Sequence, residues 1–95
     1  MSAYIIVDIT VHDTEAYKEY VKLVASFIEK HQGKYLVRGG ESEVREGTWE
    51  AGRMVVLEFP SKSEATAFLD DPGYQPVAAI RHAAATTNLV VVEGY

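Results

Sequence analysis

Three charged residues lie inside otherwise apolar stretches of this sequence, and they are the first candidates for chemistry. Asp8 falls within residues 4–11, Arg38 within 34–38 and Glu58 within 53–59. Successive side chains of a β-strand point to opposite faces, so a single charge inside an apolar strand is aimed at one side of a sheet. A charge in that position needs water, a partner or a ligand. We expect all three side chains to share one face.

An arginine between two carboxylates indicates a particular kind of chemistry. Arg38 would orient an anionic substrate through charge-assisted hydrogen bonds, while Asp8 or Glu58 would move a proton. The alternative is a structural ion-pair network with no ligand. Burial would raise the pKa of either carboxyl group and Arg38 would lower it, so the sequence leaves the direction of the shift open.

Four further residues are candidates for substrate binding. Gly39, in the pair Gly39-Gly40, would let the backbone approach a ligand. The pair lacks the strand-to-helix context of a phosphate loop, so a bulge or turn is the favoured interpretation. Trp49, in a loop flanked by glycines, is either a pocket lid or an anchor for a second subunit. Tyr74 and Arg81 share a helix stripe that would close one end of a pocket; a solvated or internally paired Arg81 is the simpler interpretation.

The sequence lacks the residue patterns of other common kinds of site. The three histidines, at positions 12, 31 and 82, have no pair at metal-ligand spacing, so we expect no metal and no cofactor. His82 is a weak candidate for a general base. There is no P-loop, dinucleotide fingerprint or cysteine.

The elements that must position these residues follow from the hydrophobic periodicity. The alternating segments predict strands at 4–11, 34–38, 53–59 and 88–93, with a short irregular strand at 43–46. The helical segments run from an N-cap at Asp13 or Thr14 to Gly33, from a capping box of Ser61 with Glu64 to Leu69, and from Gln75 or Pro76 to about Ala85.

This order predicts one α+β domain over residues 1–95 with the ferredoxin-like βαββαβ arrangement. The first and third strands are expected in the centre of a four-stranded antiparallel sheet, and the second strand beside the third. Helices would cover one face, made by Ile5, Val7, Ile9, Val11, Val55, Leu57 and Phe59. The other face would show Tyr4, Ile6, Asp8, Thr10, Leu36, Arg38, Met54, Val56 and Glu58. That face is too apolar to remain in water, which predicts a homodimer packed sheet to sheet.

The composition argues against several partners. The chain has 9 Lys and Arg against 14 Asp and Glu, a net charge of −5, and no basic run. Nucleic acid and anionic membrane surfaces are therefore not expected partners. The absence of cysteine is compatible with the cytoplasm, and we expect neither a signal peptide nor a membrane span.

Several motifs together resemble one known family, domain of unknown function 1330 (DUF1330). They are Tyr35-Leu36-Val37-Arg38-Gly39-Gly40-Glu41, Glu46-Gly47-Thr48-Trp49, Val55-Val56-Leu57-Glu58-Phe59-Pro60-Ser61, Tyr74-Gln75-Pro76, Ile80-Arg81 and Val92-Glu93-Gly94. The resemblance implies a dimeric α+β barrel, in which two ferredoxin-like protomers face each other through their sheets. That superfamily includes cofactor-free monooxygenases, isomerases, dehalogenases, haem proteins and stress-responsive domains, so no reaction is implied.

Two functions remain open from the sequence. The first is a small cytoplasmic homodimer that binds a small polar or anionic molecule in a cleft on the sheet face, with any catalysis being cofactor-independent acid–base chemistry. The second is a non-enzymatic dimeric structural or stress-response module, whose charges form an interface ion-pair network. A water-filled pocket of roughly a few hundred Å³ touching Arg38 would favour the first. A buried, salt-bridged Arg38 with no room beside it would favour the second.

Overall fold

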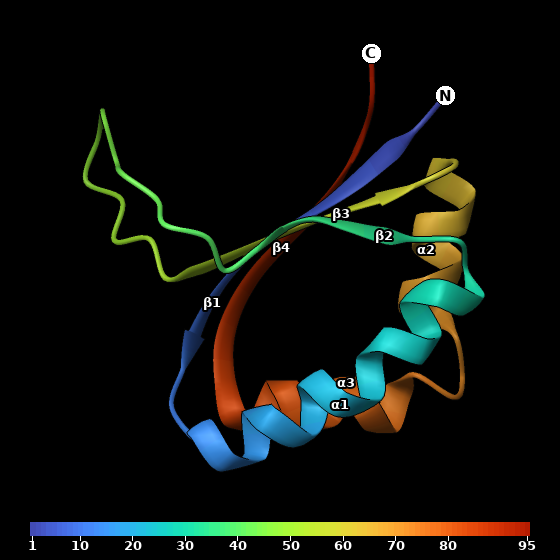
Figure 1. The fold of residues 1–95 in the computed structure, drawn as a ribbon, viewed down its shortest axis with the longest axis horizontal. Coiled ribbons are helices and arrows are strands. Elements are labelled where there is room, and N and C mark those ends of the chain that lie inside the picture. Colours follow the sequence, from blue (N-terminus) through green and yellow to red (C-terminus); the bar gives the residue numbers. More distant parts are fainter.

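The computed structural model describes residues 1–95 and contains four strands and three helices. The strands are β1 (Ala3–Val11), β2 (Lys34–Arg38), β3 (Arg53–Phe59) and β4 (Ala85–Glu93), and the helices are α1 (Thr14–Lys30), α2 (Lys62–Asp70) and α3 (Gln75–Ala84). The strands form one antiparallel sheet in the order β2-β3-β1-β4. All three helices lie on one side of the curved sheet (Figure 1). The predicted ferredoxin-like fold and its central strands are confirmed.

The helix boundaries follow the predicted capping residues. Asp13 accepts a hydrogen bond from the Ala16 amide at 3.1 Å, and Ser61 accepts one from the Glu64 amide at 3.1 Å. Each side chain satisfies an amide that has no partner inside its helix. None of the three helices is both long and apolar enough to cross a membrane.

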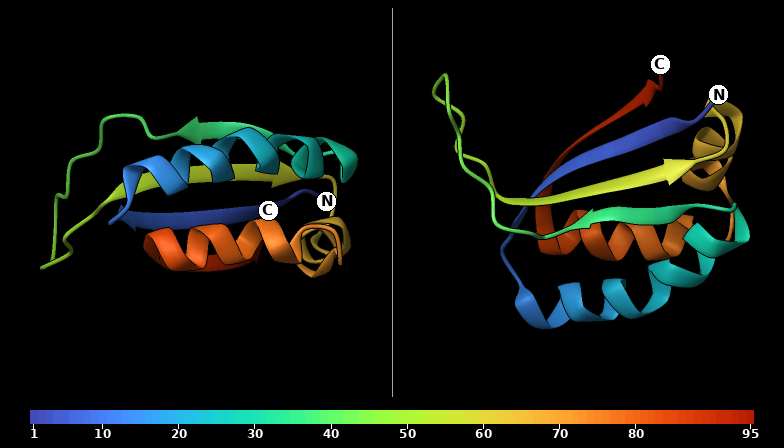
Figure 2. Two further views of the ribbon diagram at one scale, coloured as in Figure 1. Left: turned by 90° about the horizontal axis from the view of Figure 1, so that it is seen from below. Right: turned by 45° about the horizontal axis from the view of Figure 1, so that its top comes forward.

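One predicted boundary and one predicted strand were wrong. Strand β4 begins at Ala85, three residues earlier than expected, because α3 ends at Ala84 and the chain enters the sheet with no loop between. The short strand predicted at 43–46 is not formed. Residues 39–52 instead make a loop that projects from the sheet (Figures 1 and 2).

The core lies between the sheet and the helices, as the alternation predicts. The buried strand residues are Ile5, Val7, Ile9, Val55, Leu57 and Phe59, and they pack with Val24, Ile28, Phe68 and Tyr74 from the helical side. Burying one such large apolar side chain stabilises the fold by about 1.5–3 kcal/mol. Helices α1 and α3 run side by side across this core (Figure 2).

A β-bulge in β2 reverses the predicted orientation of Arg38. Tyr35 lies opposite Leu57 and Val37 lies opposite Val56, so Leu36 is an extra residue in the ladder. After this bulge Arg38 lies opposite Val55, whose side chain is buried beneath the helices. One inserted residue moves every later side chain to the other face. The prediction that Arg38 shares a face with Asp8 and Glu58 was therefore wrong.

Candidate functional site

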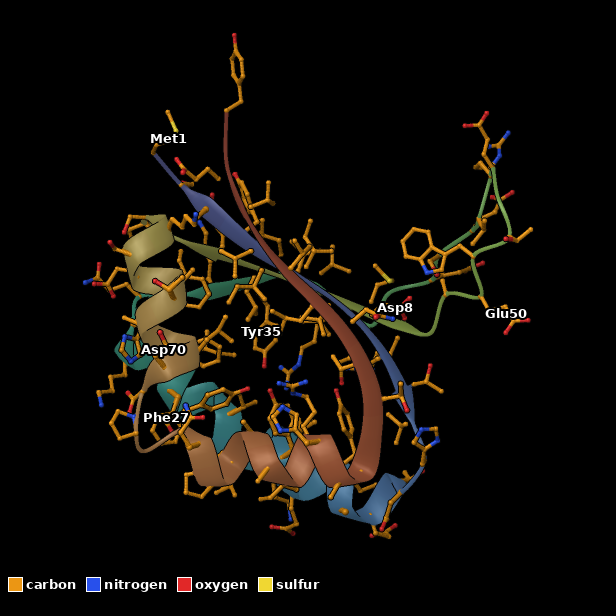
Figure 3. All side chains as sticks on the ribbon, turned by 180° about the vertical axis from the view of Figure 1, so that it is seen from behind. Met1, Asp8, Phe27, Tyr35, Glu50 and Asp70 are labelled. Carbon is orange, nitrogen blue, oxygen red and sulfur yellow. The ribbon has the colours of Figure 1, made fainter.

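A narrow cavity of about 40 Å³, well below the volume expected of a ligand pocket, lies between the sheet and helices α1 and α3. Its polar lining consists of arginines and tyrosines only: Arg38, Arg53, Arg81, Tyr17, Tyr20, Tyr35 and Tyr74. The other lining residues are apolar, and no Asp, Glu or His is among them. Tyr35 points from the sheet into this space (Figure 3). The cavity therefore combines a hydrocarbon wall with a set of positively charged hydrogen-bond donors.

Two of the arginines come from adjacent strands at one end of the cavity. The Arg38 guanidinium lies over the Tyr35 ring, 4.5 Å from its centroid, in a cation–π contact. The Arg53 guanidinium lies directly against Gly39, and its Nε atom is buried without a hydrogen-bond partner. Gly39 has a φ of +73°, which ends the strand and leaves room for Arg53. A side chain at position 39 would therefore displace Arg53, and the predicted close approach of Gly39 to a ligand stays a prediction.

Arg81 and two tyrosines form the helical wall of the cavity. Arg81 on α3 is only 6% exposed, and its guanidinium lies 5.6 Å from the centroid of the Tyr20 ring. The Tyr20 and Tyr74 hydroxyl oxygens are 2.8 Å apart and hydrogen-bonded. Burial raises the pKa of Tyr20, with Tyr74 adding to the effect, so its hydroxyl stays neutral near pH 7. Arg81 is thus not solvated: it has internal partners in Tyr20 and His82, as the simpler interpretation expected. It also lines the cavity with Tyr74.

The charge of this cavity is opposite to that of the whole protein. Three permanently charged guanidinium groups line it, none forms a salt bridge, and the chain carries a net charge of −5. Arg81 is buried, Arg53 is half-buried and Arg38 is exposed. Like charges withdrawn from water, as at Arg81, are unfavourable unless an anion or hydrogen-bond acceptors compensate them. Arginines bind carboxylates and phosphates through paired N–H donors. The arrangement is therefore suited to holding an anion.

The cavity opens towards the β4 edge of the sheet. Tyr74, Arg81 and Leu89 also line an outer groove of about 480 Å³, together with Leu69, Gln75, Ala78, His82, Ala85 and Thr87. His82 Nε2 is 3.5 Å from an Arg81 Nη atom. Arg81 therefore lines both the cavity and a solvent-exposed groove.

Asp8 lies on the opposite, helix-free face, where it holds the projecting loop. One oxygen accepts a hydrogen bond from Trp49 Nε1 at 2.7 Å, and the other accepts one from the Gly52 amide at 2.8 Å. Asp8 and the base of this loop lie together in Figure 3. Trp49 is 55% exposed and borders a hollow on this face, so it is not a lid over the arginine cavity.

Glu58 is also on the helix-free face, at a distance from Asp8. Lys34 forms a salt bridge with it at 3.2 Å, and the Tyr4 hydroxyl donates a hydrogen bond at 3.3 Å. The hydrogen bond from Lys34 lowers the pKa of Glu58. Glu58 pairs with Tyr4 and Met54 pairs with Asp8, so the two carboxylates lie about 13 Å apart along the strands. The structure therefore does not bring Asp8, Arg38 and Glu58 together.

The sequence did contain a signal for one residue that the prediction missed. Arg53 is in phase with Val55, Leu57 and Phe59, so the period-two alternation already places it on the helix-facing side of β3. Tyr20 and Tyr35 had no comparable signal, because a tyrosine on a core-facing position is ordinary packing. No group of three or more His, Asp or Glu side chains is arranged to hold a metal ion.

The fold and this cavity define a class of protein: a ferredoxin-like α+β domain with a mostly apolar, arginine-lined cavity between its sheet and its helices. The chain belongs to the family described as domain of unknown function (DUF1330), whose model matches residues 2–95. The resemblance seen in the sequence motifs is thereby confirmed. No curated protein matches the chain.

Solved structures share the fold at low sequence identity. A protein of unknown function from Rhodopseudomonas palustris has a TM-score of 0.82 and 18% identity, covering 99% of this chain and 82% of that one. SnoaB, a cofactor-independent oxygenase from Streptomyces nogalater, has a TM-score of 0.67 and 16% identity, covering 99% and 93%. A dimeric ferredoxin-like protein of unknown function from Jannaschia sp. CCS1 has a TM-score of 0.65 and 14% identity, covering 99% and 100%. These likenesses concern the fold alone.

Proposed function

We propose that this protein binds a small anionic molecule in the cavity between its sheet and its helices. The observation that carries the proposal is the set of three arginines, Arg38, Arg53 and Arg81, with no carboxylate in the lining. The apolar remainder of the lining would accept the hydrocarbon part of such a ligand. The proposed site thus lies on the helix-covered face of the sheet, whereas the sequence suggested the helix-free face.

The alternative of a purely structural ion-pair network has less support. A network of that kind requires Arg38 to meet carboxylates on the helix-free face, and Arg38 has no such partner. The carboxylates on that face have other local partners, namely Lys34 for Glu58 and the loop for Asp8. The arginines are therefore left available for a ligand.

Catalysis is a narrower possibility within the same site. SnoaB is described as a cofactor-independent oxygenase, and arginines with neutral tyrosines would stabilise negative charge on a bound substrate. A proton-accepting group is missing from the inner cavity, and His82 in the outer groove is the nearest candidate. Binding is accordingly the function that we propose.

We further propose a cytoplasmic homodimer formed through the helix-free face. This face carries Leu36, Val37, Val90 and Val92 exposed, together with the half-buried Ile6, Met54 and Val56. An apolar patch rimmed by polar groups is typical of a protein interface. The related fold from Jannaschia is described as dimeric, which supports the same arrangement here.

Ligand binding is tested by calorimetric titration with benzoate and with benzamide, its neutral counterpart. We expect benzoate to bind and benzamide not to bind, because the cavity offers positive charge without a counter-ion. Arg38→Gln should weaken benzoate binding about tenfold, the loss of one charge-assisted hydrogen bond. Arg45→Gln, which removes another exposed arginine, from the projecting loop, is the control. Equal binding of benzoate and benzamide would contradict the proposal.

The dimer is tested by sedimentation of the wild type and of Val90→Asp. A carboxylate in the middle of the apolar face should give a monomer, because its burial against a second sheet is unfavourable. Leu23→Asp, at an exposed apolar position on α1, is the matched control and should sediment like the wild type. A Val90→Asp variant that remains dimeric would show that this face is not the interface.

A further inference from the structure

The outer groove is large enough to be a binding site in its own right. Its volume of about 480 Å³ lies within the range of roughly 300–1,000 Å³ that is typical of small-molecule pockets, whereas the inner cavity measures about 40 Å³. Residues of helix α3 line one side of the groove, and residues of the edge strand β4 line the other. A molecule that is too large for the inner cavity can therefore lie in this groove.

Arg81 brings a positive charge without a counter-ion to the groove. Its side chain is almost fully buried and forms no salt bridge, and neither Asp nor Glu lines the groove. His82 is also part of the lining, and its Nε2 atom is 3.5 Å from an Arg81 Nη atom. Two nitrogen atoms at this separation can be reached by the two oxygens of one acidic group, which is the partner that a guanidinium group prefers.

The β4 side of the groove supplies a hydroxyl group that has no partner. Thr87 lies opposite Ile9 in the sheet register, and Ile9 is buried beneath the helices. Directly opposed residues on neighbouring strands point to the same face, so the Thr87 side chain lies on the helix-covered face. Its Oγ1 atom is buried and forms no hydrogen bond within the protein. A buried hydroxyl group of this kind is unfavourable unless a ligand atom satisfies it.

We infer that the outer groove binds a small organic acid: Arg81 and His82 hold its acidic group, and the Thr87 hydroxyl forms a hydrogen bond with the same ligand. The hydrocarbon part of the acid contacts the aliphatic lining, which consists of Leu69, Ala78, Ala85 and Leu89. This site shares Arg81 with the proposed cavity site and none of the other arginines. A guanidinium group has five N–H donors, so Arg81 can serve both.

The test is calorimetric titration with naphthalene-2-carboxylate and with naphthalene-2-carboxamide, its neutral counterpart. Both probes are too bulky for the inner cavity, so their binding reports on the groove. We expect the carboxylate to bind at least about tenfold more tightly, because only the carboxylate forms a charge-assisted hydrogen bond with Arg81. Equal affinities for the two probes would overturn the inference, and so would a failure of the carboxylate to bind.

Two substitutions test the placement of the probe. His82→Ala and Thr87→Val should each weaken binding of the carboxylate about fivefold, the loss of one hydrogen bond. His82 is exposed, and Thr87→Val removes a hydroxyl group without an internal partner, so both variants should fold like the wild type. Thr86→Val removes a hydroxyl group from the other face of the same strand and is the matched control, with wild-type affinity expected.

The outcomes separate this inference from the proposed function. Wild-type affinity for the carboxylate in either His82→Ala or Thr87→Val overturns the inference. If Arg38→Gln weakens binding of the carboxylate and Thr87→Val does not, the acid lies in the cavity, which overturns the groove site and supports the proposed function. The proposed function itself is decided by benzoate and Arg38→Gln, whichever way the naphthalene probes behave.

Discussion

Replacing Gly39 by alanine should damage the arginine cavity more than it damages the fold. Gly39 adopts a φ of +73°, a left-handed conformation that costs an alanine about 1–2 kcal/mol. A Cβ atom at this position would overlap the guanidinium of Arg53, which is the movable end of a long side chain. The stability loss should therefore come mainly from the backbone, while Arg53 is displaced from the cavity.

For a domain of this length, about 1–2 kcal/mol corresponds to a fall in Tm of about 5–10 °C. Gly47→Ala is the matched control, because Gly47 also has a positive φ, +87°, but has no atom near the position of a Cβ. Thermal unfolding measures the backbone effect in both variants, and titration with benzoate measures the site. We expect only Gly39→Ala to weaken binding, by about tenfold for one lost charge-assisted contact. If both variants bind benzoate like the wild type, Arg53 does not hold the anion.

Three further predictions concern residues outside the cavity. Asp8→Asn should free Trp49, seen as a change in its fluorescence, and leave benzoate affinity unchanged; lost affinity would place Asp8 in the site. Hydrogen bonds from His31, then Lys30 and the Gly73 amide, hold the pKa of Asp71 well below its usual range. The contribution of Asp71 to the free energy of unfolding is thus complete above the unfolded pKa of about 3.9 and is lost as the pH falls below it. In urea unfolding from pH 7 to 2, Asp71→Asn should therefore lose less stability at acid pH than the wild type. An identical pH dependence in both proteins would refute this. Gly52→Ala should destabilise by more than about 1 kcal/mol, because its Cβ would overlap the Ile9 carbonyl oxygen, whereas Gly40→Ala, with open space, should not; equal denaturation midpoints would contradict the packing argument.

Most of the fold could be predicted because its signals are local. The alternation of Ile5, Val7 and Ile9 identifies a half-buried strand, and Asp13 and Ser61 each supply the oxygen that a helix start requires. The order of the elements then leaves few topologies open. The boundary at Ala85 escaped prediction because Ala85-Thr86-Thr87 has no strongly apolar side chain, and its pairing with β1 decides its conformation.

The candidate site could be predicted only in part, since it depends on side-chain orientation. Arg38, Tyr74 and Arg81 were recognised as candidates and do line one cavity, but Asp8, Glu58 and Trp49 lie on the other face of the sheet. Arg53 was visible in the alternation and was overlooked. No pattern in the sequence indicated that four tyrosines would gather around the arginines.

The amino-acid order by itself determined the element sequence, the apolar face of each central strand and the negative net charge, because these follow from residue types and their spacing. Only the tertiary structure decided on which side of the sheet Arg38 lies. One extra residue in β2, Leu36, reverses that side, and whether a ladder accommodates an extra residue depends on the partner strand β3. The same long-range pairing brings Arg53 beside Gly39 and Arg81 beside Tyr20, so the cavity exists only in the assembled fold.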